Sequence, residues 1–144
     1  MAAGGLVRGT EGNASVRAGD LIAISPTALP YDTLQPEDVC LVTLGGELVE
    51  GPKPSVELPM HLALLAARPD VGAVVHTHSP RATARPPVPI ADPAPSGTPE
   101  LGMAVLAAAG DGDAVVIEGH GPVCFGTDLA GALARALELE RAAT

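Results

Sequence analysis

The sequence predicts an α/β fold in a single domain, and three observations lead to this prediction. Short runs rich in β-branched residues, bounded by Gly, Pro or Asp, are typical of strands. Three longer segments with helical apolar spacing alternate with these runs. The length of 144 residues fits one hydrophobic core. We therefore expect residues 1–144 to form one domain with one active-site region.

Five runs predict the strands, and two glycine turns predict how some of them pair. The runs are Leu21–Ser25, Val39–Leu44, Ala73–Thr77, Ala114–Glu118 and Val123–Phe125. A turn at Gly45-Gly46 would join the second run to residues 47–49 as a hairpin, and residues 119–121 would join the last two runs. Hairpins pair strands antiparallel, so the central sheet is expected to be mixed.

Three segments predict helices, and one segment between them predicts a loop. The helical segments run from Val56 to Arg68, from Thr98 to Ala109 and from Asp128 to Ala142. The last places leucines 129, 133 and 137 on one stripe. The proline-rich stretch from Arg81 to Pro99 favours extended backbone and lacks donors at its prolines. We expect this stretch to cross the surface as a loop.

Composition and charge indicate a small-molecule partner. The formal net charge is −9, with one Phe, one Tyr and no Trp. Nucleic acid and anionic membranes are disfavoured as partners because both require clustered Lys and Arg. No export signal or apolar span is indicated, so a cytoplasmic location is expected. Cys40 and Cys124 lie in apolar runs and are expected to be buried free thiols.

Three histidines form the strongest pattern in the chain. His76 and His78 are two residues apart at the end of a predicted strand, so they project to the same face. His120 lies between two glycines, which allow a tight turn and a close approach. A lone His-x-His pair is more often structural than metal-binding, but the joint pattern is more informative. Three protein ligands and one open position suit a catalytic divalent metal, and zinc is the metal we expect.

A predicted helix start and a glycine-rich segment carry weaker signals. Glu57 opens a predicted helix, where its carboxylate is either an acid/base group or a simple first-turn charge. His61 lies one turn later and is expected to pack or hydrogen-bond rather than to bind metal. Residues 9–15, with the sequence GTEGNAS, can cradle a phosphate through backbone amides and side-chain donors, or form an ordinary turn.

Five motifs in order resemble the class II aldolase/adducin family: GTEGNASVR, ISPTALPYDTL, PSVELPMH, AVVHTHS and EGHGPVCFG. The resemblance covers nearly the whole chain and implies a three-layer α/β/α domain. It implies a Zn²⁺ or other divalent metal on His76, His78 and His120, with Glu57 as general base against the metal. The metal would polarise a ketose phosphate and stabilise the enediolate formed on cleavage. The implied phosphate contacts are Asn13, Thr27, the Ala28 amide and Ser55.

Departures from the family pattern concern the phosphate contacts and the proton donor. Ala28 stands where phosphate-binding relatives have glycine, and Val56 stands where they have a second serine. Relatives begin with a helix before the GTxGN motif and carry a longer stretch after the His-x-His strand. In aldolases that stretch supplies a tyrosine, across a subunit interface, which protonates the leaving aldehyde. Tyr31 matches a different part of the pattern, so the sequence identifies no acid.

The resemblance implies a zinc-dependent aldehyde-lyase that cleaves a sugar phosphate or a related hydroxy-ketone. Two alternatives stay open. One is another metal-enediolate reaction, namely dehydration, 4-epimerisation or decarboxylation, which the missing tyrosine favours. The other is a non-catalytic adducin-like interaction domain, which has no reason to keep the metal ligands. Family members commonly form homo-oligomers, so a tetramer or dimer is expected.

Overall fold

A computed structural model describes residues 1–143 and shows the predicted α/β fold with a mixed sheet. Eight strands are ordered β4-β3-β2-β1-β5-β8-β7-β6. Only the β6–β7 pair is parallel among the strands of this described part. The strands are β1 Asn13–Ala18, β2 Leu21–Ile24, β3 Cys40–Thr43, β4 Leu48–Glu50, β5 Ala73–His76, β6 Ile90–Ala91, β7 Ala114–Ile117 and β8 Gly121–Gly126.

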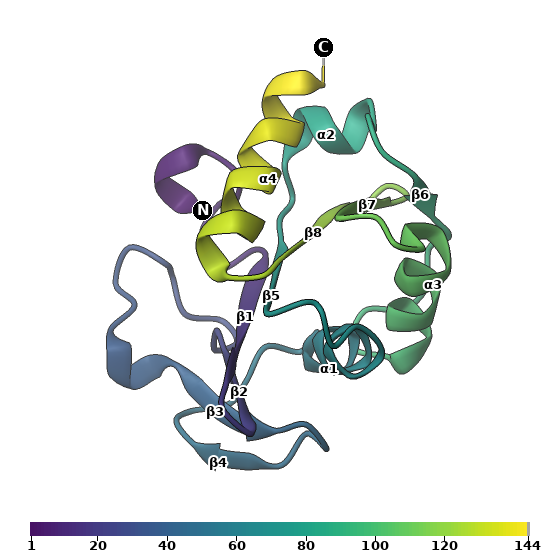
Figure 1. Cartoon of the computed structure of the whole chain (residues 1–144). Helices are drawn as coiled ribbons and strands as arrows, with labels where there is room; N and C mark the ends of the chain where they lie inside the picture. The colour runs from purple at the N-terminus through teal and green to yellow at the C-terminus, as the bar shows by residue number, and fades with distance from the viewer. Residues whose placement is uncertain (144) are drawn as a thin grey trace.

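Helices cover both faces of the sheet, which confirms the three-layer architecture. Helices α1 (Leu58–Ala67) and α3 (Pro99–Ala109) lie on one face, and α2 (Pro80–Ala84) and α4 (Leu129–Ala142) lie on the other (Figure 1). Two short 3₁₀ helices span Ala2–Gly4 and Pro36–Asp38. Within residues 1–143, none of the helices combines the length and the apolar character needed to cross a bilayer.

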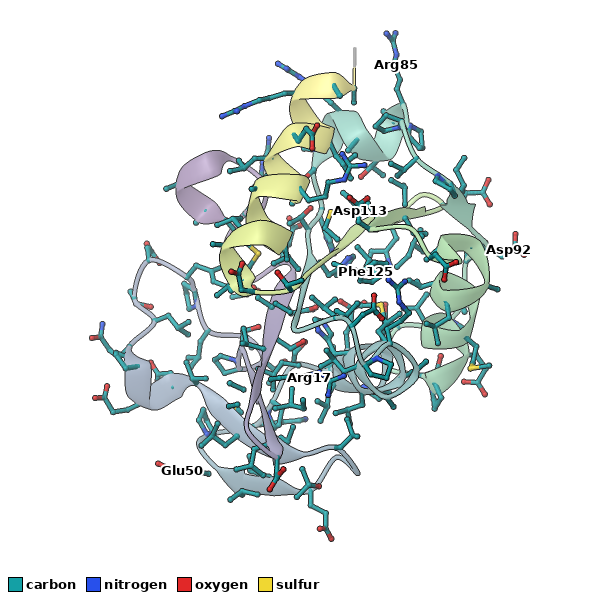
Figure 2. All side chains as sticks on the ribbon, in the orientation of Figure 1. Arg17, Glu50, Arg85, Asp92, Asp113 and Phe125 are labelled. Carbon is teal, nitrogen blue, oxygen red and sulfur yellow. The ribbon has the colours of Figure 1, made fainter. Side chains whose placement is uncertain are left out.

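The central strands are apolar because both of their faces are covered. All four residues of β5 are buried: Val74 packs in the core under α1 and α3, whereas Ala73 and Val75 pack in the core under α4. Phe125 from β8 joins the α1 and α3 core, and Figure 2 shows it in the interior, while Glu50 and Asp92 lie at the periphery. Strand β5 therefore fixes the position of His76, its last residue.

The two predicted hairpins and the two buried thiols are confirmed. Strands β3 and β4 pair antiparallel across the first glycine turn, and β7 and β8 pair antiparallel across the second. Cys40 and Cys124 are free and buried. Burial raises the pKa of Cys124 to about 12, so this thiol stays protonated near neutral pH. Both cysteines therefore act as small apolar core residues.

Strand β1 is the main element that the sequence reasoning missed. Residues Asn13 to Ser15 were expected in a loop, but they begin β1, which pairs with β2 and β5. Asn13, Ser15 and Arg17 alternate along this strand, and their side chains contact α1 or the backbone at its end. The sequence of this strand resembles a turn because the residues that face α1 are polar rather than apolar.

The proline-rich stretch is not wholly a loop, because it contains most of α2 and all of β6. The carboxylate of Glu140 on α4 accepts hydrogen bonds from the backbone N–H of Arg81 at 3.1 Å and of Ala82 at 2.9 Å. These bonds satisfy amides that are otherwise free at a helix start. The tertiary contact with α4 thus stabilises α2 in a sequence that by itself favours extended backbone.

Two helices differ in detail from expectation. Helix α1 begins at Leu58, so Glu57 lies just before the first turn rather than within it. In α4 the fully buried side chains are Ala132, Ala136 and Leu139, whereas Leu129 is 42% exposed. The small alanines let α4 approach β8 closely, and this contact decides which stripe of the helix faces the sheet.

The close approach of β8 to the segment after β5 gives a stability prediction. A Cβ at Gly121 would lie 2.1 Å from the Thr77 carbonyl oxygen. We expect Gly121→Ala to lower the free energy of unfolding by about 1–3 kcal/mol, because backbone must move. Urea unfolding measures this loss. At Gly45 the nearest atom is 3.6 Å away, so Gly45→Ala serves as the control. Equal stability of the two variants would contradict the prediction.

Candidate metal centre

The three predicted histidines come together at one edge of the sheet. His76 ends β5, His78 follows two residues later, and His120 lies in the turn between β7 and β8. One ring nitrogen from each lies within 4.8 Å of the others. The ring centroids are 4.7 to 5.1 Å apart, and the rings meet edge to face. The cluster forms because His76 and His78 are two residues apart at a strand end and His120 lies in the neighbouring hairpin turn.

Two of the three histidines have ligand atoms at the spacing that a divalent metal requires, and the third histidine offers a nitrogen within 4.8 Å of them. The Nε2 atoms of His76 and His120 are 3.3 Å apart. Tetrahedral zinc with Zn–N bonds of about 2.0–2.1 Å places its ligand atoms about 3.3–3.4 Å apart. His76 Nδ1 donates to the Pro122 carbonyl at 3.0 Å, which turns its Nε2 toward the cluster. His76 is fully buried, whereas the side chains of His78 and His120 are 31% and 23% exposed.

Glu57 lies against the same cluster. Its Oε2 is 3.3 Å from His76 Nε2, and its Oε1 is 3.6 Å from His120 Nε2. Asn13 Nδ2 donates to Oε2 at 2.7 Å, and Ser96 Oγ donates to Oε1 at 3.3 Å. Burial would raise the pKa of Glu57, but His76 and the Asn13 hydrogen bond hold the pKa below its ordinary value. The carboxylate is therefore ionised near neutral pH.

His76 and His78 are neutral near neutral pH. Burial lowers the pKa of His76 to about 4, although the adjacent Glu57 opposes this shift. Burial also lowers the pKa of His78, with the neighbouring His120 acting in the same direction. A metal binds the neutral imidazole, so little proton release is needed before these two residues can ligate.

A cavity of about 280 Å³ opens beside the cluster and contains most of the predicted site. Within the described part of the chain, no Lys or Arg side chain lines it. An anion there would depend on backbone amides, on hydroxyls and on the nearby start of α1. The lining residues are Thr10, Glu11, Gly12, Asn13, Pro26, Thr27, Ala28, Ser55, Val56, Glu57, His78, Ser96 and His120.

Ala28 holds an unusual backbone conformation at the rim of this cavity. Its φ is 57°, and no other non-glycine residue within 1–143 has a positive φ. A left-handed conformation costs an L-residue with a Cβ roughly 1–2 kcal/mol. Such strain persists where the surrounding structure imposes it, and it clusters at ligand sites. The observation agrees with the expectation that relatives have glycine here.

Some site residues lie where sequence reasoning did not place them. Ser96 reaches Glu57 from the proline-rich stretch, where a single serine has no distinguishing signal. Asn13 lines the cavity in which the phosphate contacts are expected. Its side chain also hydrogen-bonds to Glu57 and His61, which the sequence does not predict. Tyr31 donates its hydroxyl to the Gly12 carbonyl, so it supports the glycine-rich loop from behind.

A family model, "Class II Aldolase and Adducin N-terminal domain", matches residues 1–85 and 84–144. The match divides just after α2. This division falls in the segment after the His-x-His strand, where the sequence predicts that the chain departs from the family pattern.

Known proteins resemble the chain over most of its length. It is 39% identical over 158 positions to "5-methylthioribulose-1-phosphate/5-deoxyribulose-1-phosphate aldolase" of Rhodospirillum rubrum, covering 96% of this chain and 72% of that protein. It is 51% identical over 85 residues to "5-deoxy-D-ribulose 1-phosphate aldolase" of Bacillus thuringiensis, covering 57% of this chain and 40% of that protein. The solved structure of L-fuculose-1-phosphate aldolase from Thermus thermophilus superposes with a TM-score of 0.84 at 30% identity, covering 98% of this chain and 84% of that one.

The buried histidines give a prediction for stability against pH. Burial lowers the pKa of His61 to about 3 and that of His76 to about 4, both below the ordinary value of 6.5. Between these values the unfolded chain binds more protons, so stability is lost as pH falls from about 6.5 toward 3 or 4. At pH 4.5 each histidine should cost on the order of 2–3 kcal/mol.

Urea unfolding of the metal-free protein between pH 7 and pH 4.5 measures this loss. His61→Gln should remove roughly half of it, since the amide does not titrate. An unchanged pH dependence in this variant would contradict the assignment to His61.

Proposed function

Because the chain belongs to the class II aldolase and adducin family, we propose that it is an enzyme, a divalent-metal-dependent aldehyde-lyase acting on a phosphorylated ketose. One observation carries the proposal. The Glu57 carboxylate lies 3.3 Å from His76 Nε2 and 3.6 Å from His120 Nε2, at the wall of an open cavity. A metal-ligand set and an ionised base thus face the same space.

Zinc is the metal we propose for His76, His78 and His120. Three imidazole nitrogens suit zinc better than magnesium or calcium, which prefer oxygen ligands. When bound, the cation would supply Lewis-acid polarisation of the substrate's carbonyl and hydroxyl oxygens. The partial exposure of His78 and His120 leaves a side of the cluster open to the cavity.

Glu57 exchanges the proton at the carbon next to the substrate carbonyl. In cleavage, the bond from this carbon to the hydroxyl-bearing carbon breaks, its electron pair moves toward the carbonyl, and the hydroxyl proton passes to solvent in the open cavity. Glu57, which is ionised at rest, takes up a proton from solvent and delivers it to the carbon. In the reverse direction the Glu57 carboxylate removes this proton as a general base. Asn13 and Ser96 hold the carboxylate in place by hydrogen bonds.

The substrate phosphate is proposed to lie in the cavity near the start of α1. Thr27 and Ser55 offer hydroxyls, and Ala28 offers a backbone amide. These groups and the helix start favour an anion without a basic side chain. The relatives named above act on ribulose or fuculose 1-phosphates by name, which supports a sugar phosphate.

A second candidate is another reaction of the same metal site: dehydration, 4-epimerisation or decarboxylation. One observation favours it: the Tyr31 hydroxyl is bound to the Gly12 carbonyl behind the loop. A retro-aldol step is assisted by an acid–base group at the hydroxyl that becomes the aldehyde, and Tyr31 does not line the cavity, so it is not placed to serve. The adducin-like interaction domain is disfavoured, because such a domain needs neither the histidine cluster nor Glu57.

The proposal also includes three properties of the whole protein. We propose that residues 1–144 act as one domain, and that the chain assembles as a homo-oligomer, a dimer or tetramer. A cytoplasmic location remains a prediction from the sequence. Light scattering of the purified protein tests the assembly.

Metal analysis and two variants test the proposed roles. Purified protein should contain close to one zinc per chain, and a panel of ketose 1-phosphates should reveal aldehyde release. His76→Ala should lose both metal and activity, because it removes a buried ligand. Glu57→Gln should keep metal but lower kcat by roughly 10²–10⁴-fold, since the proton cannot be exchanged.

Full activity of Glu57→Gln would exclude Glu57 as the base. Wild-type protein that is correctly folded as purified but contains no metal would contradict the enzyme proposal. The control is Leu48→Ala on the edge strand β4, because Leu48 is exposed and does not line the cavity. This variant should change neither the metal content nor kcat.

Two variants test the phosphate contacts. Ala28→Gly removes a methyl group from a strained rim residue, and Val56→Ser adds a hydroxyl at the cavity wall. Each should lower KM for a phosphorylated ketose by about 10-fold or more, because one variant opens the approach to a backbone amide and the other adds a hydroxyl donor, and a hydrogen bond to a charged group contributes about 1.5–3 kcal/mol. KM for the unphosphorylated ketose should not change. Equal effects on both substrates would contradict a phosphate site here.

A further inference from the structure

We propose that His61 is a positioning residue for Glu57, which it orients by donating a hydrogen bond through Nε2 to the side chain of Asn13. This inference rests on the proposed function, because it assigns a purpose to the orientation of Glu57. His61 does not line the cavity and is not in the metal cluster. Its effect on the reaction must therefore pass through Asn13.

Four side chains form a continuous hydrogen-bonded chain between β1 and α1. Ser15 Oγ is 2.6 Å from His61 Nδ1, and His61 Nε2 is 2.5 Å from Asn13 Oδ1. Asn13 Nδ2 is 2.7 Å from Glu57 Oε2. All four residues are buried, with at most 5% of any of them exposed. We call these four residues the Ser15–Glu57 relay.

The orientation of the Asn13 amide fixes the direction of donation through the relay. Its nitrogen faces Glu57 and donates to Oε2 at 2.7 Å, since an amide nitrogen only donates. The Asn13 oxygen then faces His61, so His61 Nε2 must carry the hydrogen. The Ser15 hydroxyl donates to Nδ1. Burial lowers the pKa of His61 to about 3, so the ring holds one proton near neutral pH.

The relay matters because the Asn13 amide has two faces of opposite polarity. Without a donor at position 61, the buried Asn13 oxygen has no hydrogen-bond partner, which is costly. The amide would then shift or rotate to find another donor, and its hydrogen bond to Glu57 Oε2 would be weakened or lost. Glu57 would move away from the histidines, and a displaced carboxylate is a poorer base. The hydrogen bond from His61 prevents this change.

Two substitutions separate positioning from packing. His61→Leu keeps an apolar volume but removes the donor, and His61→Gln keeps an N–H donor near the same place. We expect His61→Leu to lower kcat roughly 10- to 100-fold with unchanged KM and metal content, as for other outer partners of metal sites. His61→Gln should recover most of kcat. Leu64→Val, at a buried residue one turn later on α1, should keep wild-type kcat.

A second readout does not depend on turnover. Nitrogen NMR of the metal-free, ¹⁵N-histidine-labelled protein should show His61 as the neutral Nε2–H tautomer. In uniformly ¹⁵N-labelled protein, the Asn13 side-chain amide signals should shift in His61→Leu but not in Leu64→Val. A protonated ring or the Nδ1–H tautomer would overturn the relay, as would equal kcat of His61→Leu and wild type. A wild type with no ketose-phosphate activity but the Nε2–H tautomer would overturn the proposed function instead.

Discussion

The site depends on a polar seam between strand β1 and helix α1. Two residues along a strand advance about 6.6 Å, and four residues along a helix advance about 6.0 Å. Asn13, Ser15 and Arg17 on β1 can therefore meet successive turns of the α1 segment. Asn13 contacts Glu57 and His61, Ser15 contacts His61, and Arg17 donates to the carbonyls of Leu65, Arg68 and Val71 at the helix end. Figure 2 shows Arg17 between β1 and α1.

The seam joins two parts that the chemistry requires together. The histidines belong to the sheet, whereas Glu57 belongs to the start of α1. Asn13 connects these parts, because it pairs with His76 across β1 and β5 and also donates to Glu57. A helix that packed only by apolar contact could slide along the sheet by fractions of an ångström. Directional hydrogen bonds at three levels of α1 restrict such sliding.

Apolar patterns allowed the prediction of most of the fold, and polar contacts explain what was missed. Strands β5 and β7 are continuous apolar runs, and His76 and His78 follow from the period of two at a strand end. Strand β1 was missed because its inward residues are polar, and α2 was missed because Glu140, distant in sequence, stabilises it. The role of Glu57 came from family resemblance, since one carboxylate before a helix has no spacing to mark it. Nothing in the sequence marks Ser96 as a partner of Glu57.

The anchoring of α2 bears on how this chain tolerates change in length. Thr77 and Ser79 share a hydrogen bond between their hydroxyls, Thr83 Oγ1 donates to the Ser79 carbonyl, and Glu140 holds the helix start. The segment after His78 is thus fixed before the chain reaches residues 84 and 85, where the two family matches meet. Insertions or deletions between that point and β6 add or remove surface backbone, while the histidine cluster and Ser96 stay in place. Evolution can therefore lengthen or shorten this connection without rebuilding the metal ligands.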